Sequence, residues 1–262
     1  MDNEHHKRTT YKAMKRLVFI VEGETEEAFV NTILRPYFQQ CGLYNPIQCF
    51  KIKHTQGGMR KYSYVRNDVL NTIYERDVIV TTMFDLYALP SSFPGFAEAQ
   101  TITSHLERVI FLEDKMKEDL EAHQGQPFSN YIPYIQLHEF EALAFSSANS
   151  FEALFEDNEM NIKGIREVIA AFSNPEDIND SPETAPSKRM QKLIPGYNKV
   201  AYGISLIEYT GIETILQFST SFGIITIMLK QAWHCSSGKT SPRFYEALAT
   251  PVNSVCSFAR RS

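Results

Sequence analysis

Leu17-Val18-Phe19-Ile20-Val21-Glu22-Gly23-Glu24-Thr25-Glu26-Glu27 is a run of five apolar residues that passes directly into a glutamate and a glycine. A continuous apolar run of β-branched and aromatic residues predicts a fully buried strand, the kind found in parallel sheets. Gly23 predicts a sharp turn, and Thr25 is a suitable N-cap for a helix with acids in its first turn. Glu22 is therefore expected at the carboxyl end of a central strand, the edge where open α/β sheets bind ligands.

The rest of the first half alternates between strand and helix patterns. Strands are expected over residues 47–54, 78–84 and 131–137, and helices over 26–40, 64–74 and 97–123. Pro36 is expected to bend or split the first helix, and Pro133 predicts an edge strand or an irregular one. Strands alternating with helices imply crossover connections, so the sequence predicts an α/β fold with a parallel sheet flanked by helices.

The second half lacks strand signals. Residues 139–172 and 187 onward predict helices, whereas 173–186, rich in Asn, Asp, Ser and Pro, predicts an exposed loop. The expected organisation is a flexible tail over 1–14, an α/β core over 15–145, and a mostly helical region over 146–262 packed on that core.

Composition predicts a cytoplasmic protein. Residues 1–14 are polar and do not resemble a signal peptide. The longest apolar stretch, 215–229, is shorter than the ~20 residues of a membrane span, so no membrane contact is expected. The four cysteines lack the close pairing of a metal site and predict reduced thiols; they are Cys41, Cys49, Cys235 and Cys256.

Acidic residues follow three of the expected strands: Glu22, Asp85, and the pair Glu139 and Glu141. Because parallel strands place their carboxyl ends on one side, these acids can converge on Mg²⁺ or Mn²⁺, which prefer oxygen ligands. Taken alone, an acid at a strand end is as readily a cap or a surface residue. If a helix begins at Glu139, that residue and Glu141 lie about 200° apart and cannot both face one ion.

Four segments carry a resemblance to a known family. They are Val21-Glu22-Gly23-Glu24-Thr25-Glu26, Phe84-Asp85-Leu86-Tyr87, His138-Glu139-Phe140-Glu141-Ala142-Leu143 and Pro186-Ser187-Lys188-Arg189. The first two resemble the motifs of the Toprim domain of topoisomerases, primases and OLD-type nucleases. Together the four resemble an uncharacterised bacterial Toprim-like family often encoded beside ATPases of defence islands. The second Toprim motif ends in Asp-x-Asp, and Tyr87 stands in place of its second aspartate.

The resemblance implies a Toprim-like fold and a magnesium-dependent nuclease that hydrolyses DNA or RNA. It further implies a role in antiphage defence with an ABC- or AAA-type ATPase partner, and a homo-oligomer is possible. The implied catalytic residues are Glu22, Asp85, Glu139, Glu141 and His138, and the implied metal ligands are Glu22, Asp85 and Glu141. The alternative, favoured by Tyr87, is a non-catalytic subunit that binds an ATPase or nucleic acid and regulates it. Nucleotidyl transfer lacks a visible nucleotide-selecting motif.

Substrate phosphate is expected at local basic groups, because the net charge of −5 gives no overall attraction for nucleic acid. The candidates are Lys188, Arg189, Lys199 and His54. Ser187 is expected to cap a helix whose amino end would suit a phosphate. The competing interpretation of Lys188 and Arg189 is a solvated basic turn, and that of His138 is a hydrogen-bonded core residue.

Overall fold

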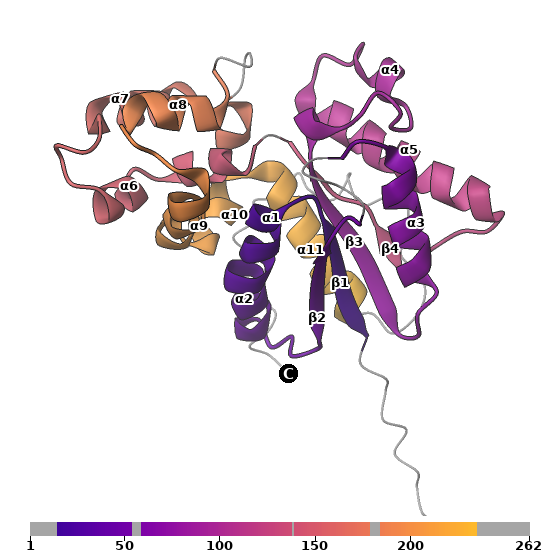
Figure 1. The fold of residues 1–262 in the computed structure, drawn as a ribbon. Helices are drawn as coiled ribbons and strands as arrows, with labels where there is room; N and C mark the ends of the chain where they lie inside the picture. Colours follow the sequence, from indigo (N-terminus) through magenta and orange to yellow (C-terminus); the bar gives the residue numbers. More distant parts are fainter. Residues whose placement is uncertain (1–14, 54–58, 138, 179–183, 235–262) are drawn as a thin grey trace, which may run out of the picture.

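The computed structural model describes residues 15–53, 59–137, 139–178 and 184–234. Its centre is a parallel sheet in the order β2-β1-β3-β4, with β5 also pairing β3 (Figure 1). The strands are β1 Arg16–Val21, β2 Ile47–Lys51, β3 Val78–Asp85, β4 Tyr131–Ile132 and β5 Ile135–Gln136. The expected α/β fold with a parallel sheet flanked by helices is confirmed.

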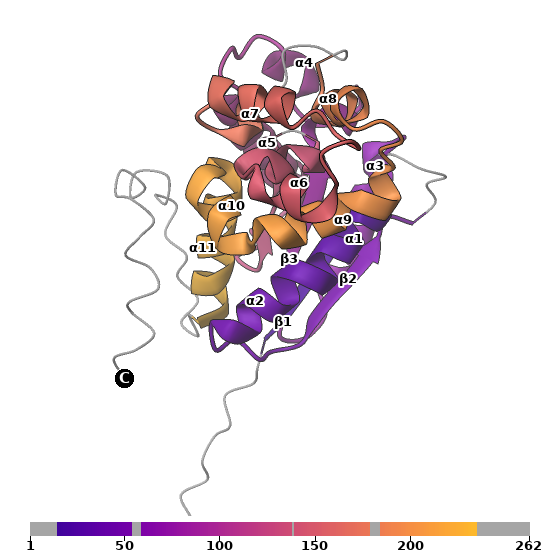
Figure 2. The ribbon, with the colours of Figure 1, turned by 90° about the vertical axis from the view of Figure 1, so that its left-hand side faces the viewer.

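The helices cover both faces of the sheet and extend beyond its carboxyl edge. They are α1 Glu24–Phe29, α2 Arg35–Gln40, α3 Tyr62–Ile73, α4 Phe96–Ala99, α5 His105–Gln124, α6 Asn149–Leu154, α7 Ile162–Ala171, α8 Pro186–Leu193, α9 Lys199–Thr210, α10 Ile212–Phe218 and α11 Thr220–His234. Helices α7 and α8 lie beyond the carboxyl edge in both ribbon views (Figures 1 and 2).

Successive residues of β1 point to opposite faces and so separate two cores. Phe19 packs with α1, α2 and the helices of the second half, whereas Val18 and Ile20 pack with α3 and α5. On the first face Phe222 of α11 meets Phe29 of α1 at 5.5 Å between ring centroids. The helical second half therefore completes one of the two cores of the sheet.

Several expected elements are interrupted. The strand expected over 131–137 is split into β4 and β5 around Pro133, at the edge of the sheet, because proline cannot donate to the ladder. The helix expected over 97–123 is two helices, α4 and α5, with Ser104 capping α5. The helix expected over 26–40 runs without a break from α1 through the π-helical segment Val30–Leu34 into α2, and Pro36 lies two residues after that segment.

Two local predictions were wrong. Helix α1 begins at Glu24 with Gly23 as its N-cap, so Thr25 lies inside the helix; the Glu26 carboxylate accepts a hydrogen bond from the Gly23 amide and supplies the cap. The loop expected to be exposed over 173–186 contains Glu176, which is fully buried. Its carboxylate accepts hydrogen bonds from the backbone amide and the hydroxyl of Ser221, at the amino end of α11.

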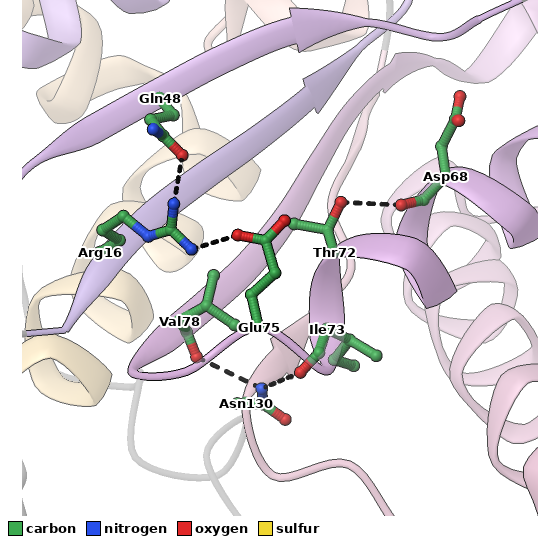
Figure 3. Close-up of polar contacts among 8 residues, drawn as sticks. All are labelled: Arg16, Gln48, Asp68, Thr72, Ile73, Glu75, Val78 and Asn130. Carbon is green, nitrogen blue, oxygen red and sulfur yellow. Dashed lines mark hydrogen bonds and ion pairs between the residues drawn. The ribbon is translucent and has the colours of Figure 1, made fainter.

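A polar network fixes the amino edge of the sheet (Figure 3). Arg16 of β1 donates to the side chain of Gln48 on β2 and forms an ion pair with Glu75. The amide of Asn130 donates to the carbonyls of Ile73 and Val78 at 3.0 and 3.3 Å. These side chains therefore link the starts of the strands to one another and to the end of α3.

No single helix in the described part of the chain is long and apolar enough to cross a membrane. The consecutive helices Ile212–Phe218 and Thr220–Lys230 reach that length and composition only together, with a bend of 113° between them.

Candidate active site

Glu22 and Asp85 lie at the carboxyl ends of two neighbouring strands. Val21, the residue before Glu22, pairs with Met83 of β3, so the ends of both strands are level. The backbone of Asp85 acts on the Glu22 carboxylate and partly opposes the rise of its pKa. The Asp85 carboxylate in turn accepts one from the amide of Tyr87 at 3.1 Å. The structure therefore brings together the two acids that the sequence placed at one edge.

The pKa values of both acids are raised. Burial raises the pKa of Asp85 to about 7, assisted by the charges of Glu22 and Glu139, although the Tyr87 amide and Lys199 oppose the shift. Burial, followed by the charge of Glu26, raises the pKa of Glu22. Half-buried carboxylates that repel one another favour either a proton or a cation between them.

Glu139 and Glu141 have separate partners. Glu139 precedes the 3₁₀ segment Phe140–Ser146, and its Oε2 accepts a hydrogen bond from the Ser187 amide of α8 at 2.9 Å. Glu141 is only 2% exposed and pairs with Lys199 of α9 at 3.1 Å. Of these two acids, Glu139 is the one whose charge raises the pKa of Asp85.

Lys199 is the cation at the centre of this acidic group. Partial burial lowers its pKa, but the charges of Glu141, Glu26 and Glu139 outweigh that effect and raise it overall. Burial still raises the pKa of Glu141 despite the lysine. The sequence suggested Lys199 only as a phosphate-binding residue, because nothing in the pattern pairs it with an acid 58 positions away.

The donor set fits a magnesium ion at Glu22 and Asp85. Oε2 of Glu22 and Oε1 of Glu141 are buried and accept no hydrogen bond within the described part of the chain. Among the described residues no group of three or more His, Cys, Asp or Glu side chains is arranged to hold a metal ion. Magnesium does not require such a cage, because it is commonly held by one or two carboxylates, water and substrate phosphate.

The basic turn at Lys188 and Arg189 differs from the expectation. Helix α8 begins at Pro186 with Ala185 as N-cap, so Ser187 does not cap it. The Ser187 amide already serves the Glu139 carboxylate. Arg189 donates to the Thr184 carbonyl at 2.8 Å and lies over the Phe172 ring, whereas Lys188 is exposed. Lys188 is therefore the member of the turn better placed to meet a polyanion.

Two predicted site residues, His54 and His138, lie outside the described residues. Two neighbours of the acids were not singled out as part of the site. Glu26 caps α1 and also raises the pKa of Glu22. Its place in the first helical turn predicted only an acid that complements the helix dipole. Tyr197, 9% exposed, has its pKa raised by burial and by the charges of Glu141 and Glu139.

The raised pKa of Asp85 predicts a pH-dependent stability of the metal-free protein. The folded state keeps this proton up to about pH 7, whereas the unfolded chain loses it near the ordinary value of 3.8. Between those values the folded state binds more protons, so this residue makes stability fall as pH rises. We therefore expect the free energy of unfolding of Asp85→Asn, relative to that of the wild type, to increase from pH 4 to pH 7. The measurement is urea unfolding in the presence of EDTA. The control is Asp157→Asn, at an exposed position, whose stability difference from the wild type should not change with pH. An equally constant difference for Asp85→Asn would contradict the prediction.

Removal of the Lys199 ammonium group should destabilise the protein, because the buried Glu141 carboxylate then lacks its ion-pair partner. At pH 8 we expect Lys199→Met to lower the free energy of unfolding by about 2 kcal/mol; a fully buried pair would lose about 3–5 kcal/mol, but the lysine side chain is 43% exposed. The loss should shrink as the pH falls, because the raised pKa of Glu141 lets this carboxyl group take up a proton. The double variant with Glu141→Gln should recover most of the stability in urea titrations. A double variant as unstable as Lys199→Met would contradict this explanation.

The sequence model of one protein family, described as a domain of unknown function (DUF4276), matches residues 21–226. This range contains the acidic and basic residues of the candidate site. No curated protein and no solved structure matches the chain.

Proposed function

The chain belongs to the DUF4276 family, and for this member we propose a function as a metal-dependent nuclease of the Toprim class. The observation that carries the proposal is the pair Glu22 and Asp85 at adjacent strand ends, both with raised pKa values. Perturbed acids at the ligand-binding edge of a parallel sheet are typical of functional sites. The resemblance of the four sequence segments to Toprim-like proteins supports the same class.

The residues have distinct roles in this proposal. Glu22 and Asp85 would hold the ion, and Glu139 is a further acid whose charge acts on Asp85. When bound, a divalent ion neutralises phosphate charge and lowers the pKa of an attacking water. The Lys199 ammonium would offer positive charge to a phosphate oxygen. In the overall reaction water oxygen bonds to phosphorus, one P–O ester bond breaks, and the leaving oxygen gains a proton.

The test is cleavage of labelled DNA and RNA by the purified protein with Mg²⁺, Mn²⁺ or EDTA. The proposal expects shortened products only with a divalent ion. Absence of cleavage with every substrate, both alone and with a candidate ABC- or AAA-type ATPase partner, would overturn it.

A second candidate is a non-catalytic subunit that regulates an ATPase or binds nucleic acid. The ion pair between Lys199 and the buried Glu141 favours it, because an ammonium group already neutralises one of the acids. Tyr87 in place of the second Toprim aspartate points the same way. Copurification with the ATPase, without metal-dependent cleavage, would support this candidate over the nuclease.

The biological setting follows from the resemblance alone. We propose an effector of antiphage defence that works in the cytoplasm beside an ABC- or AAA-type ATPase. Loss of phage protection on replacing Asp85, with the ATPase intact, would support that setting.

Lys188 should contribute to polyanion attraction. We expect Lys188→Ala to weaken nucleic-acid binding and to reduce the slope of log affinity against log salt by about 1, because one fewer counterion is released. The measurement is fluorescence anisotropy over a salt series with Ca²⁺ in place of Mg²⁺. Lys163→Ala is the matched control, because that lysine is 87% exposed on α7. Equal slopes for both variants would mean that Lys188 is only a solvated surface residue.

A further inference from the structure

Lys199 is a cation that the fold places among the acids of the candidate site. It is the first residue of α9, and the Asn198 side chain caps this helix by accepting a hydrogen bond from the Ala201 amide at 3.1 Å. Helix α9 packs against α1 and against the 3₁₀ segment Phe140–Ser146, and Figure 2 shows it beside α1. The backbone that carries Lys199 is therefore held against two segments that bear acids of the site.

The charge of Lys199 acts on all four acids of the candidate site. Its ammonium nitrogen lies 3.1 Å from Oε2 of Glu141. Its charge opposes the rise in the pKa values of Glu22 and Asp85, and the charge of Glu139 acts on the ammonium in return. A metal ion held by these carboxylates would have the same set of charged neighbours.

The contacts of the four acids divide them into two pairs. Glu139 accepts a hydrogen bond from the Ser187 amide at 2.9 Å, and Glu141 is paired with an ammonium group. Glu22 and Asp85 are the two acids that remain for an ion, and magnesium is commonly held by one or two carboxylates together with water and phosphate. A second ion would need oxygen ligands of its own. The arrangement of the acids therefore suits a single ion.

We propose that the Lys199 ammonium takes the place of a second divalent ion, so that the site binds one ion per chain and Glu141 becomes a ligand only when the ammonium is removed. The inference rests on the proposed function and specifies the composition of its metal site. Glu141 is 2% exposed, so its charge needs a cation beside it, and the lysine supplies one without a metal. A metal ion and an ammonium at the same buried carboxylate would repel one another.

The experiment is a titration of the metal-free protein with Mn²⁺, in which electron paramagnetic resonance measures the unbound ion. We expect one bound Mn²⁺ per chain for the wild type and two for Lys199→Met, because Glu141, on which the charge of Glu139 also acts, then offers its carboxylate to a second ion. The double variant with Glu141→Gln should return to one. Lys199→Arg keeps the positive charge and should bind one, and Lys188→Met is the control for removal of an exposed lysine.

Glu141→Gln alone tests the same inference even if Lys199→Met does not fold, because it leaves the ammonium in place. It should still bind one Mn²⁺, whereas Asp85→Asn should lose more than about tenfold in affinity for the ion, as expected when a direct ligand is removed. A loss in Glu141→Gln as large as that in Asp85→Asn would show that Glu141 is a ligand in the wild type, and would overturn the inference.

Three further outcomes overturn the inference: two Mn²⁺ bound by the wild type, one bound by a Lys199→Met variant that circular dichroism shows to be folded, or none bound by the wild type. Cleavage assays with Mg²⁺ on the same preparations separate the inference from the proposed function. If the wild type cleaves but binds two ions, only the role of Lys199 fails. If the wild type binds one ion and Lys199→Met binds two, without cleavage of any substrate, only the nuclease proposal fails.

Discussion

Asp85→Asn should lower phosphodiester hydrolysis by about a thousandfold, because it removes a charged ligand of the proposed ion. Loss of about 4 kcal/mol of transition-state stabilisation corresponds to that factor. Glu22→Gln should have an effect of the same order, since both acids hold the same ion. The measurement is the rate of cleavage of a labelled strand at saturating Mg²⁺, together with circular dichroism to show that the fold persists.

Glu24→Gln is the matched control, because its side chain is 78% exposed and pairs with Lys51 on the surface. It should retain activity within about twofold of the wild type, as expected of an exposed ion pair of small energetic weight. Full activity in either Asp85→Asn or Glu22→Gln would show that the two strand ends do not hold a catalytic ion.

Phe222→Ala should lower the free energy of unfolding by about 3–5 kcal/mol, the usual cost of removing a buried phenylalanine. Phe222 is 1% exposed and contacts the rings of Phe29 and Tyr134. It therefore joins α11 to α1 and to the edge of the sheet. Urea unfolding followed by circular dichroism should show one transition shifted to a lower midpoint, because sheet and helices share a core.

Phe218→Ala is the comparison, because Phe218 is 41% exposed on α10. It should change stability by less than about 1 kcal/mol, since less apolar surface leaves the core. Equal effects of the two substitutions, or a separate early transition for α11 alone, would show that the second half of the chain does not complete the core.

The sequence could predict what depends on local pattern. The apolar runs that became β1 and β3 are long and β-branched, so their burial and the place of Glu22 and Asp85 followed from the parallel arrangement. Contacts between distant segments could not be predicted in the same way. The bond from the Ser187 amide to Glu139 and the burial of Glu176 against Ser221 join segments about 45 positions apart. No periodicity in either segment encodes its partner.

In the proposed metal site, the raised pKa of Asp85 would link ion uptake to acidity. With a pKa of about 7 the carboxyl carries a proton in a large share of molecules near neutrality. A cation held between Glu22 and Asp85 would have to displace that proton, so binding of the proposed ion would release a proton and a lower pH would weaken it. The affinity of this site for its ion would therefore vary within the ordinary pH range of a cell, without any change in the backbone.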